Sequence, residues 1–333
     1  MHPLLQSVAD RRLGVFTSQE ALAADYSIDD IKAALRGRRW VRLRKGVYTT
    51  RECVAAADQR ELHLLDCVAV LLSLDAGPVL SHSSAARLHE LLVPGAVAHD
   101  VRVTDVVQWR RGRGYRVARA GLPPGDVVPW LTFGATSVAR TLVDCAREWP
   151  LLPAVIAMDA ALHAERVRRS ELQAAVHAAR HRVGASAAAR ACGLSDGRAE
   201  SPLETEGRLA LLAAGLPLPE LQVELHDSRG FLARVDAWYE EAAVAVEFDG
   251  LVKFTDPRGG RTPAEVAWHE KRREDEIRSL DVRVVRVVQA DLPRLRGPAE
   301  RLRDLLAHPL TGPRRFRIVR RTEPGSHSED DVA

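Results

Sequence analysis

Cysteine is rare in this sequence, and no cysteine has the spacing of a metal or redox motif. The chain of 333 residues contains no CxxC pair and no cysteine-histidine pattern typical of zinc sites. Its four cysteines lie far apart in the chain, at Cys53, Cys67, Cys145 and Cys192. We therefore expect neither a disulfide framework nor a structural zinc site, and reduced thiols are the default.

Long apolar runs are missing as well. The most apolar stretch, LHLLDCVAVLLSL at residues 62–74, is too short to cross a bilayer and contains Asp66. The N-terminus lacks a basic segment followed by an apolar one, so no secretion signal is indicated. These absences predict a soluble cytoplasmic protein with no membrane partner.

Lysine is scarce against an arginine-rich background. Of 48 basic residues only four are lysines, namely Lys32, Lys45, Lys253 and Lys271. The formal net charge of +3 is too small to indicate a partner by itself, so the distribution of charge carries more information than the total. The length and the 46% share of hydrophobic residues allow two or three domains, each with its own core.

The pattern of elements divides the chain into four parts and indicates an α/β protein of several domains, of the α+β kind. We expect a helix-turn-helix domain at 1–50, a mixed α/β domain at 55–195, a domain with a central mixed sheet at 198–310, and a tail at 311–333 whose end is disordered.

Residues 1–50 carry the signals of two short helices followed by a basic hairpin. Thr17 with Glu20, and Ser27 with Asp30, have capping-box spacing, and GRRWVRLRKGVYTT is typical of a hairpin. This order predicts a winged helix-turn-helix that brings the start of its second helix to the major groove of double-stranded DNA. The phosphates would then be contacted by Arg36, Arg38, Arg39, Arg42, Arg44 and Lys45. A small helical cap with a solvated basic face is the alternative.

The same segment resembles the winged-helix domain of AbiEi-like antitoxins, which belong to type IV toxin-antitoxin systems. The stretches VLSHSSAARLHELLVPG and TSVARTLVDCAREW are similar to the segments that follow it in those proteins, and the similarity covers about residues 5–195. The resemblance implies sequence-recognising DNA binding, often autoregulatory, and a cognate toxin as partner. It implies no catalysis.

The region 55–195 offers little chemistry. Helical patterns at 56–75, 83–92, 137–147 and 151–190 surround a strand-rich part at 99–133. The residues Ser81, His82, Ser83 and His89 suggest a nucleophile and base, but a helix start capped by Ser81 or Ser83, with structural histidines, explains them better. A basic turn either extends a nucleic-acid surface or solubilises a loop, through Arg110, Arg111 and Arg113.

Residues 200–310 are expected to form a mixed sheet with helices. The sequences SPLE from Ser201 and TPAE from Thr262 mark two helix starts. Three successive strands followed by a helix that crosses to a further strand predict the mixed sheet. The expected helices are 202–214, 263–280 and 297–307, and the expected strands are 221–226, 231–238, 242–249 and 282–288.

The hairpin RVDAWYEEAAVAVEFDG, residues 234–250, has acids where a core hairpin would be apolar. Alternation places Glu247 and Asp249 on one face with two alanines, which leave room for a ligand, and apolar residues on the other face. A tight turn of even length at Glu240 and Glu241 would set Asp236 diagonal to Glu247, so that their carboxylates converge on one cation. An edge hairpin with its acids facing solvent is the alternative.

Carboxylates gathered in this way suit Mg²⁺, which is held by one or two carboxylates together with waters and substrate phosphate. We expect Asp236 and Glu247 as metal ligands and Glu204 as a further helical acid, although its capping position also explains Glu204. If the strand continues past Gly250, Lys253 lies on the same face as Glu247 and Asp249. Catalysis of phosphodiester hydrolysis by a Mg²⁺-activated water would then fall to Asp236, Glu247, Asp249 and Lys253.

Residues 198–292 resemble the PD-(D/E)XK nuclease superfamily, and within it a domain group related to very-short-patch-repair endonucleases. The resemblance rests on ESPLETEGRLALLAAGLPLPELQ, RVDAWYEEAAVAVEFDG and KRREDEIRSLDVRVVRV, and it implies metal binding by Asp236 and Glu247. Asp249 stands where a lysine is usual, and Lys253 stands where a histidine is common. The chain is therefore either a DNA-binding protein with a Mg²⁺-dependent endonuclease-like domain or an antitoxin-like transcriptional regulator whose nuclease-like domain is inactive.

Overall fold

The protein is described by a computed structural model that covers residues 1–74, 77–97, 99–249, 276–309 and 312–324. Its described part is a mixed α/β chain, as predicted, and it contains three sheets. The chain forms two compact units, Met1–Ala154 with Ser170–Arg190, and Val155–Arg169 with Ala191–Ala333. The segments expected as separate domains at 1–50 and 55–195 thus fall largely within the first unit.

The first fifty residues form three helices and a small antiparallel sheet with strand order β1-β3-β2. Both predicted capping boxes are present, so the two helix starts are confirmed. The aromatic rings of Phe16 and Trp40, 4.7 Å apart, centre a core to which the helices contribute apolar residues. The elements are α1 (Pro3–Asp10), β1 (Phe16–Thr17), α2 (Ser18–Ala23), α3 (Ile28–Arg36), β2 (Trp40–Arg44) and β3 (Val47–Thr50).

A six-stranded mixed sheet with strand order β6-β7-β5-β4-β9-β8 follows in the first unit. Its strands are β4 (Val79–Leu80), β5 (Val101–Asp105), β6 (Arg110–Gly112), β7 (Tyr115–Arg119), β8 (Val127–Trp130) and β9 (Phe133–Thr136). The helices of this region are α4 (Arg51–Ala56), α5 (Gln59–Ser73), α6 (His82–Leu88) and α7 (Val138–Ala146).

The helical pattern at 151–190 corresponds to three helices, α8 (Leu151–His163), α9 (Arg169–Ala178) and α10 (Ala185–Leu194). Glu165 (φ 52°) and Gly184 (φ 79°) adopt left-handed conformations that interrupt a right-handed helix. Gly184 is also required sterically, because a Cβ there would lie 2.3 Å from the carbonyl oxygen of Arg147. Backbone conformation at these two positions divides the helical stretch.

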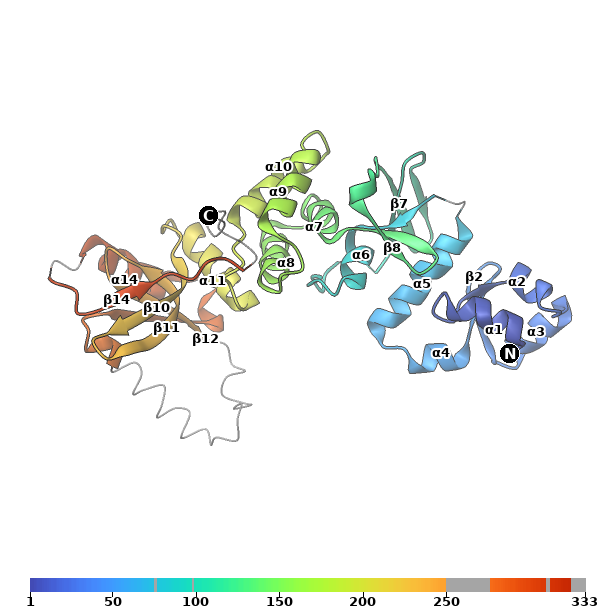
Figure 1. Cartoon of the computed structure of the whole chain (residues 1–333), viewed down its shortest axis with the longest axis horizontal. Coiled ribbons are helices and arrows are strands. Elements are labelled where there is room, and N and C mark those ends of the chain that lie inside the picture. Colours follow the sequence, from blue (N-terminus) through green and yellow to red (C-terminus); the bar gives the residue numbers. More distant parts are fainter. Residues whose placement is uncertain (75–76, 98, 250–275, 310–311, 325–333) are drawn as a thin grey trace, which may run out of the picture. The chain divides into compact units, whose positions relative to one another are not determined.

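The second unit contains the predicted mixed sheet, with strand order β13-β12-β11-β10-β14. Strands β12 and β13 are parallel and the other neighbours are antiparallel. Figure 1 shows β10, β11 and β12 next to one another with α11 beside them. The elements are α11 (Pro202–Ala213), β10 (Glu220–Asp227), β11 (Gly230–Tyr239), β12 (Val244–Asp249), β13 (Arg283–Val288), α14 (Arg296–Ala307) and β14 (Arg317–Val319).

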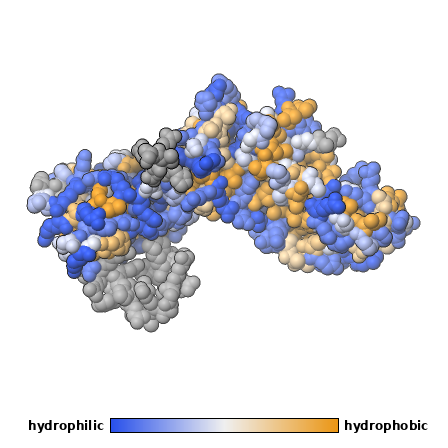
Figure 2. All heavy atoms as spheres, viewed as in Figure 1, coloured by the Kyte–Doolittle hydropathy of each residue, from blue (hydrophilic) through white to orange (hydrophobic). Residues whose placement is uncertain are grey.

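Both faces of strand β12 are buried. Val246 and Phe248 pack in one core with Leu211 of α11 and Leu302 of α14. The close approach of α11 requires Gly207, where a Cβ would lie 2.1 Å from the ring of Phe248. Figure 2 shows a mostly hydrophilic surface over the visible face of this unit, as expected when its apolar residues fill the interior.

The opposite face of the hairpin forms a second core. Ala243 and Ala245 are fully buried there beside Trp238 and Ile277. The expected separation of the two faces is confirmed, but the alanines do not leave room for a ligand. Their small volume admits the indole of Trp238 instead.

Part of the expected tail belongs to the second unit. Strand β14 pairs with β10 and extends the sheet by one strand. Beyond it, Glu323 forms an ion pair with Arg169 and accepts a hydrogen bond from the backbone N–H of Gly197, at 2.6 Å. The segment 325–333 lies outside the described residues, as does the expected helix at 263–280 up to residue 275.

Two expectations from composition can be compared with the structure. Within the described ranges, every helix is too short or too polar to span a bilayer. All four cysteines are free thiols, and burial raises the pKa of the Cys67 and Cys145 thiols. Neither of these two thiols is therefore prone to ionise at neutral pH.

Candidate functional site

Glu204 lies in the first turn of α11, where its carboxylate is buried and accepts a hydrogen bond from the N-cap residue of the helix. Ser201 is the N-cap: its Oγ accepts from the Glu204 N–H and donates to Glu204 Oε1 at 2.9 Å. The backbone N–H of Glu200 donates to Glu204 Oε2, also at 2.9 Å. Glu204 is only 7% exposed, so the helix start and the burial together hold this acid in one orientation.

Asp236 on β11 repels Glu204. Burial is the larger cause that raises the pKa of Glu204, and the Asp236 carboxylate raises it further, despite the hydrogen bonds that favour the charged form. Asp236 Oδ2 itself accepts from the backbone N–H of Phe248, at 2.9 Å. The fold thus brings together two of the acids that the sequence singled out, one from a helix and one from a strand.

The register of the β11-β12 hairpin differs from the expected one by two residues. Trp238 pairs with Ala245, and Ala237 pairs with Val246, whereas a tight turn would have set Asp236 opposite Ala245. The connection takes four residues, and the Ala243 N–H closes it by donating to the carbonyl of Glu240. The pairing of β11 with β12 reaches from Tyr239 and Val244 to Ala237 and Val246, and Asp236 next to it accepts from the backbone N–H of Phe248.

Glu247 and Asp249 have different surroundings. Glu247 is 7% exposed and lies beside Arg286 in the parallel pairing of β12 with β13. Asp249 forms an ion pair with Arg286, 2.8 Å between Oδ2 and Nε. The Arg286 guanidinium already compensates the Asp249 charge, which counts against Asp249 as a reacting group. Lys253 lies outside the described residues.

The donor set fits a divalent cation in part. Across the described ranges, no three side chains among His, Cys, Asp and Glu are arranged to hold an ion. Glu204 and Asp236 still satisfy the need of Mg²⁺ for one or two protein carboxylates, with waters and substrate phosphate completing the octahedron. Sequence reasoning missed Gln222, whose Nε2 donates to Glu204 Oε2 at 2.9 Å; its signal was an amide between apolar neighbours in the LQV stretch of a strand.

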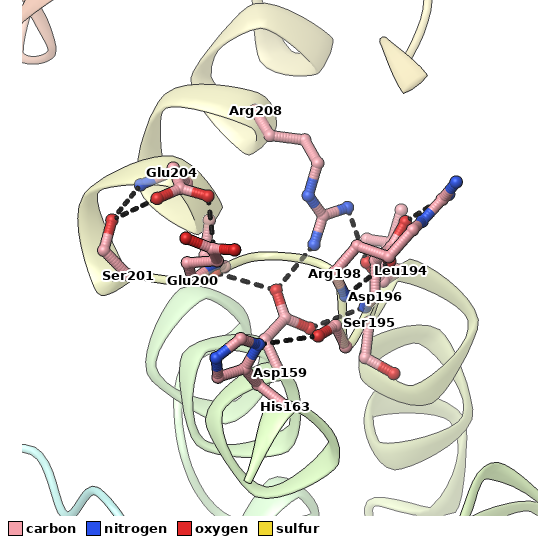
Figure 3. A network of polar contacts seen from close by, with 12 residues as sticks. Asp159, His163, Leu194, Ser195, Asp196, Arg198, Glu200, Ser201, Glu204 and Arg208 are labelled. Carbon is pink, nitrogen blue, oxygen red and sulfur yellow. Dashed lines mark hydrogen bonds and ion pairs between the residues drawn. The ribbon is translucent and has the colours of Figure 1, made fainter. Parts of the chain in front are cut away.

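Arg208, one turn after Glu204 on α11, does not neutralise the acids, because another carboxylate holds it (Figure 3). Its Nη2 lies 2.8 Å from Asp159 Oδ2, and both side chains are almost fully buried. The same oxygen accepts from Thr205 Oγ1, and Asp159 Oδ1 accepts from the backbone N–H of Asp196 at 2.7 Å. Burial raises the pKa of Asp159 to about 6, which leaves it ionised at neutral pH.

The basic residues expected to bind DNA fall into two groups. Arg44 is held within the first unit: Nη2 lies 2.7 Å from Asp66 Oδ2, Nε lies 2.9 Å from Oδ1, and Nη1 donates to the carbonyl of Arg113. This ion pair makes Arg44 a structural residue, contrary to prediction. The other residues of the predicted DNA-binding set are all exposed, on α3 and around the β2-β3 hairpin: Arg36, Arg38, Arg39, Arg42 and Lys45.

The start of α3 is acidic. Asp29 and Asp30 are exposed there, and hydrogen bonds from Ser27 lower the pKa of Asp30. Carboxylates repel phosphates, so this end of the helix is unsuited to the DNA backbone. Lys32, the exposed basic residue nearest this end, is paired with Asp29, and the arginines predicted to bind DNA begin at the opposite end of α3 with Arg36.

Ser81 and His82 are interior residues and not a nucleophile and base open to substrate. The sequence predicted Ser81 or Ser83 as the capping residue of this helix. Ser81 is the N-cap residue of α6, but its hydroxyl makes no capping hydrogen bond. It accepts from Thr104 Oγ1 at 2.8 Å and lies 2.9 Å from His82 Nδ1. Burial lowers the pKa of His82 to about 4, so the imidazole is neutral at physiological pH.

A turn before β6 exposes large apolar side chains next to arginines. Val107 and Trp109 are 75% and 72% exposed, although Asp105 fixes this turn by accepting from the backbone N–H of Val107 at 2.7 Å. Arg110 and Arg111 follow directly and are exposed. Exposed apolar residues on an ordered turn are typical of a contact surface.

Comparison with known proteins identifies relatives without a described function. No protein-family model matches the chain. Two proteins from strains of Mycobacterium tuberculosis, "Uncharacterized protein MT2308" and "Uncharacterized protein Rv2248", are each 36% identical over 163 residues, which are 49% of this chain. The chain spans 58% of the length of these curated relatives.

Among solved structures, the crystal structure of the RV2827C protein from Mycobacterium tuberculosis is similar at a TM-score of 0.39 and 17% sequence identity. The match covers 66% of this chain and 82% of that one. At this level the likeness supports no conclusion about activity.

Proposed function

We propose that the protein binds double-stranded DNA through its first fifty residues and hydrolyses DNA phosphodiesters with Mg²⁺ in its second unit. The proposal rests on one observation above all: the carboxylate of Glu204, held by Ser201 and Glu200, and that of Asp236, held by the Phe248 N–H, lie close enough together for Asp236 to raise the pKa of Glu204. Like charges brought together in this way raise the free energy of the folded state, and a cation or a proton would relieve that cost.

Glu204 and Asp236 would hold the Mg²⁺, with Glu247 near the same end of the sheet. The bound ion would supply an activated water and shield the phosphodiester charge. The hydrogen bonds from Ser201 and Glu200 would keep the Glu204 carboxylate oriented, and the Phe248 N–H would do the same for Asp236. Both acids would therefore be positioned before substrate arrives.

The element order of residues 1–50 supports DNA binding. The order of a helix, a short strand, two helices and a hairpin, with strand order β1-β3-β2, is compatible with a winged helix-turn-helix that binds DNA. The exposed arginines lie at the end of α3 and in the hairpin, so these parts would contact the phosphates. The acidic start of α3 would stay clear of the backbone.

Loss of two exposed arginines is expected to weaken DNA binding in a salt-dependent manner. The Arg38→Ala/Arg42→Ala double variant should reduce the slope of log K against log salt concentration by about 2, since each lost phosphate contact lowers it by about 1. Fluorescence anisotropy with duplex DNA at several salt concentrations measures the slope. Arg190→Ala, at an exposed arginine of the same unit, serves as the control.

An unchanged slope in Arg38→Ala/Arg42→Ala, with intact folding by circular dichroism, would contradict DNA binding by this surface. Arg44→Ala is unsuitable as a test, because loss of the pair with Asp66 would alter the fold of the first unit.

A second function, that of an antitoxin-like DNA-binding regulator with an inactive nuclease-like domain, is favoured by the exposed turn around Trp109. Tryptophan and arginine are enriched where protein interfaces hold most of their binding energy. Val107, Trp109 and the arginines that follow would suit a partner protein with an acidic rim around an apolar pocket.

For this second function, Trp109→Ser should weaken the complex with a co-expressed toxin at least about 30-fold, equivalent to about 2 kcal/mol. Binding measured by isothermal titration, with the exposed Val183→Ser as a control, provides the comparison. Equal affinity of Trp109→Ser and the unaltered chain for that toxin would refute this surface as the interface.

A further inference from the structure

Gln222 on β10 has a buried side-chain amide in which the nitrogen forms a hydrogen bond and the oxygen forms none. Its side chain is 2% exposed, and Nε2 donates to Glu204 Oε2 at 2.9 Å. The other half of the amide, Oε1, is buried and accepts no hydrogen bond. A buried acceptor without a partner destabilises the folded state, so a ligand that binds to this oxygen would compensate for that cost.

The backbone of Gln222 is strained as well. Its φ of 54° is left-handed, a conformation that glutamine rarely adopts and that raises the free energy of the folded state. The β10-β11 ladder pairs Leu221 with Ala237 and Val223 with Val235, and leaves unpaired the position between them, where Gln222 faces Asp236. The fold therefore accepts two unfavourable features at one residue, at the point where that residue meets the two acids.

The chemistry of the neighbours limits what can satisfy Gln222 Oε1. Because Nε2 donates to the Glu204 carboxylate, the oxygen of the same planar amide is the free acceptor. Ionised carboxylates accept hydrogen bonds and donate none, so neither Glu204 nor Asp236 can satisfy it. A hard cation can, because amide and carboxylate oxygens are its preferred ligands.

We propose that Gln222 Oε1 is a third protein ligand of the divalent cation, together with carboxylate oxygens of Glu204 and Asp236. This inference rests on the proposed function for the presence of the cation, and it adds a ligand that no acidic motif would reveal. It also agrees with the absence, in the described ranges, of a group of three metal-binding acidic, histidine or cysteine side chains. A neutral amide leaves the two carboxylates to balance the charge of one divalent ion.

Manganese binding by the full chain, without DNA, tests the proposal. The concentration of free Mn²⁺ is read by electron paramagnetic resonance during titration of the unaltered protein, Gln222→Met and Gln108→Met. Methionine keeps the size of glutamine but removes the amide. We expect Gln222→Met to bind Mn²⁺ at least about 10-fold more weakly, and Gln108→Met, altered at a half-buried glutamine of the first unit, to bind like the unaltered chain.

A second measurement separates a ligand from a residue that only orients Glu204. Protein made by cell-free synthesis with glutamine carrying ¹³C at the side-chain carbonyl is loaded with Mn²⁺ and studied by ¹³C electron-nuclear double resonance. Ligation through Oε1 should give an isotropic coupling transmitted through the metal-oxygen bond, and Gln222→Met should abolish it. A hydrogen bond to Glu204 alone gives no such coupling.

The outcomes distinguish this inference from the function on which it rests. Mn²⁺ binding without the ¹³C coupling, or with equal affinity in Gln222→Met, would overturn the role of Gln222 and leave the two-carboxylate site intact. A coupling in a protein that cleaves no DNA would support the ligand and refute the hydrolysis. Failure of the unaltered chain to bind Mn²⁺ would refute both.

Discussion

Replacing Asp236 with asparagine should abolish Mg²⁺-dependent cleavage of duplex DNA and, at the same time, raise the thermal stability of the second unit. Cleavage should fall at least about 100-fold, because a neutral amide neither balances the charge of the cation nor holds it as tightly. Stability should rise because the repulsion that helps to raise the pKa of Glu204 disappears. The asparagine side-chain oxygen can still accept from the Phe248 N–H.

The opposite signs of these two effects make the experiment specific. Replacing a carboxylate with a purely structural role would lower the stability of the protein. Replacing a residue that is kept for activity often raises it, because unfavourable interactions in the site are removed. A plasmid-nicking assay with Mg²⁺ measures cleavage, and thermal unfolding without metal measures stability. Asp227→Asn is a matched control, since Asp227 lies on the same sheet but holds only the turn with Arg229.

Two results would count against the proposed site. Cleavage by Asp236→Asn at the rate of the unaltered chain would exclude Asp236 as a metal ligand. A lower unfolding temperature together with unchanged cleavage would show that Asp236 is a structural acceptor for Phe248. Glu204→Gln tests the acid of α11 independently, and we again expect lower cleavage and higher thermal stability.

Replacing Arg208 with leucine should destabilise the second unit by about 3–5 kcal/mol, because it leaves the Asp159 carboxylate buried without its cation. Arg208 Nη1 also donates to the carbonyl of Leu194, at 2.7 Å, so the change would leave this half-buried carbonyl without its hydrogen-bond donor as well. The loss should appear as faster amide hydrogen exchange in α11 and β11, measured by mass spectrometry, with little change in β5.

The double variant Asp159→Leu/Arg208→Leu should recover most of this loss. Apolar residues of similar volume often replace a buried ion pair with no net cost, since the desolvation of both charges is avoided. If the double variant is as unstable as Arg208→Leu alone, packing and not the unpaired charge causes the loss. Exchange in Arg208→Leu equal to that of the unaltered chain would show that the pair contributes nothing.

The local order of elements was predictable from the sequence because it depends on neighbouring residues. The capping pairs Thr17 with Glu20 and Ser27 with Asp30 begin the helices that they predicted. The expected strand at 282–288 matches β13 within one residue. Caps, turns and alternation act within a few residues, and this is the range over which a single sequence is informative.

Register and pairing across long distances were less accessible. The expected tight turn set Asp236 opposite Ala245, but the four-residue turn places Trp238 opposite Ala245 instead. Arg44 had the pattern of a phosphate-binding residue, and only the fold shows Asp66 beside it. The residues 159 and 208 carry no motif that would indicate a buried ion pair between them, because sequence separation hides contacts made by tertiary packing.

The sequence by itself determined the succession of helices and strands, the alternating faces of the acidic hairpin, and the choice of Glu204, Asp236 and Glu247 as candidate acids, since these follow from local periodicity and residue chemistry. Only the tertiary structure decided which charges are compensated. It brought Arg286 to Asp249 and Asp159 to Arg208, and it placed Gln222 in hydrogen-bond contact with Glu204 and opposite Asp236 in the β10-β11 ladder. Electrostatic free energy depends on distance and burial in space, and neither can be obtained from position along the chain.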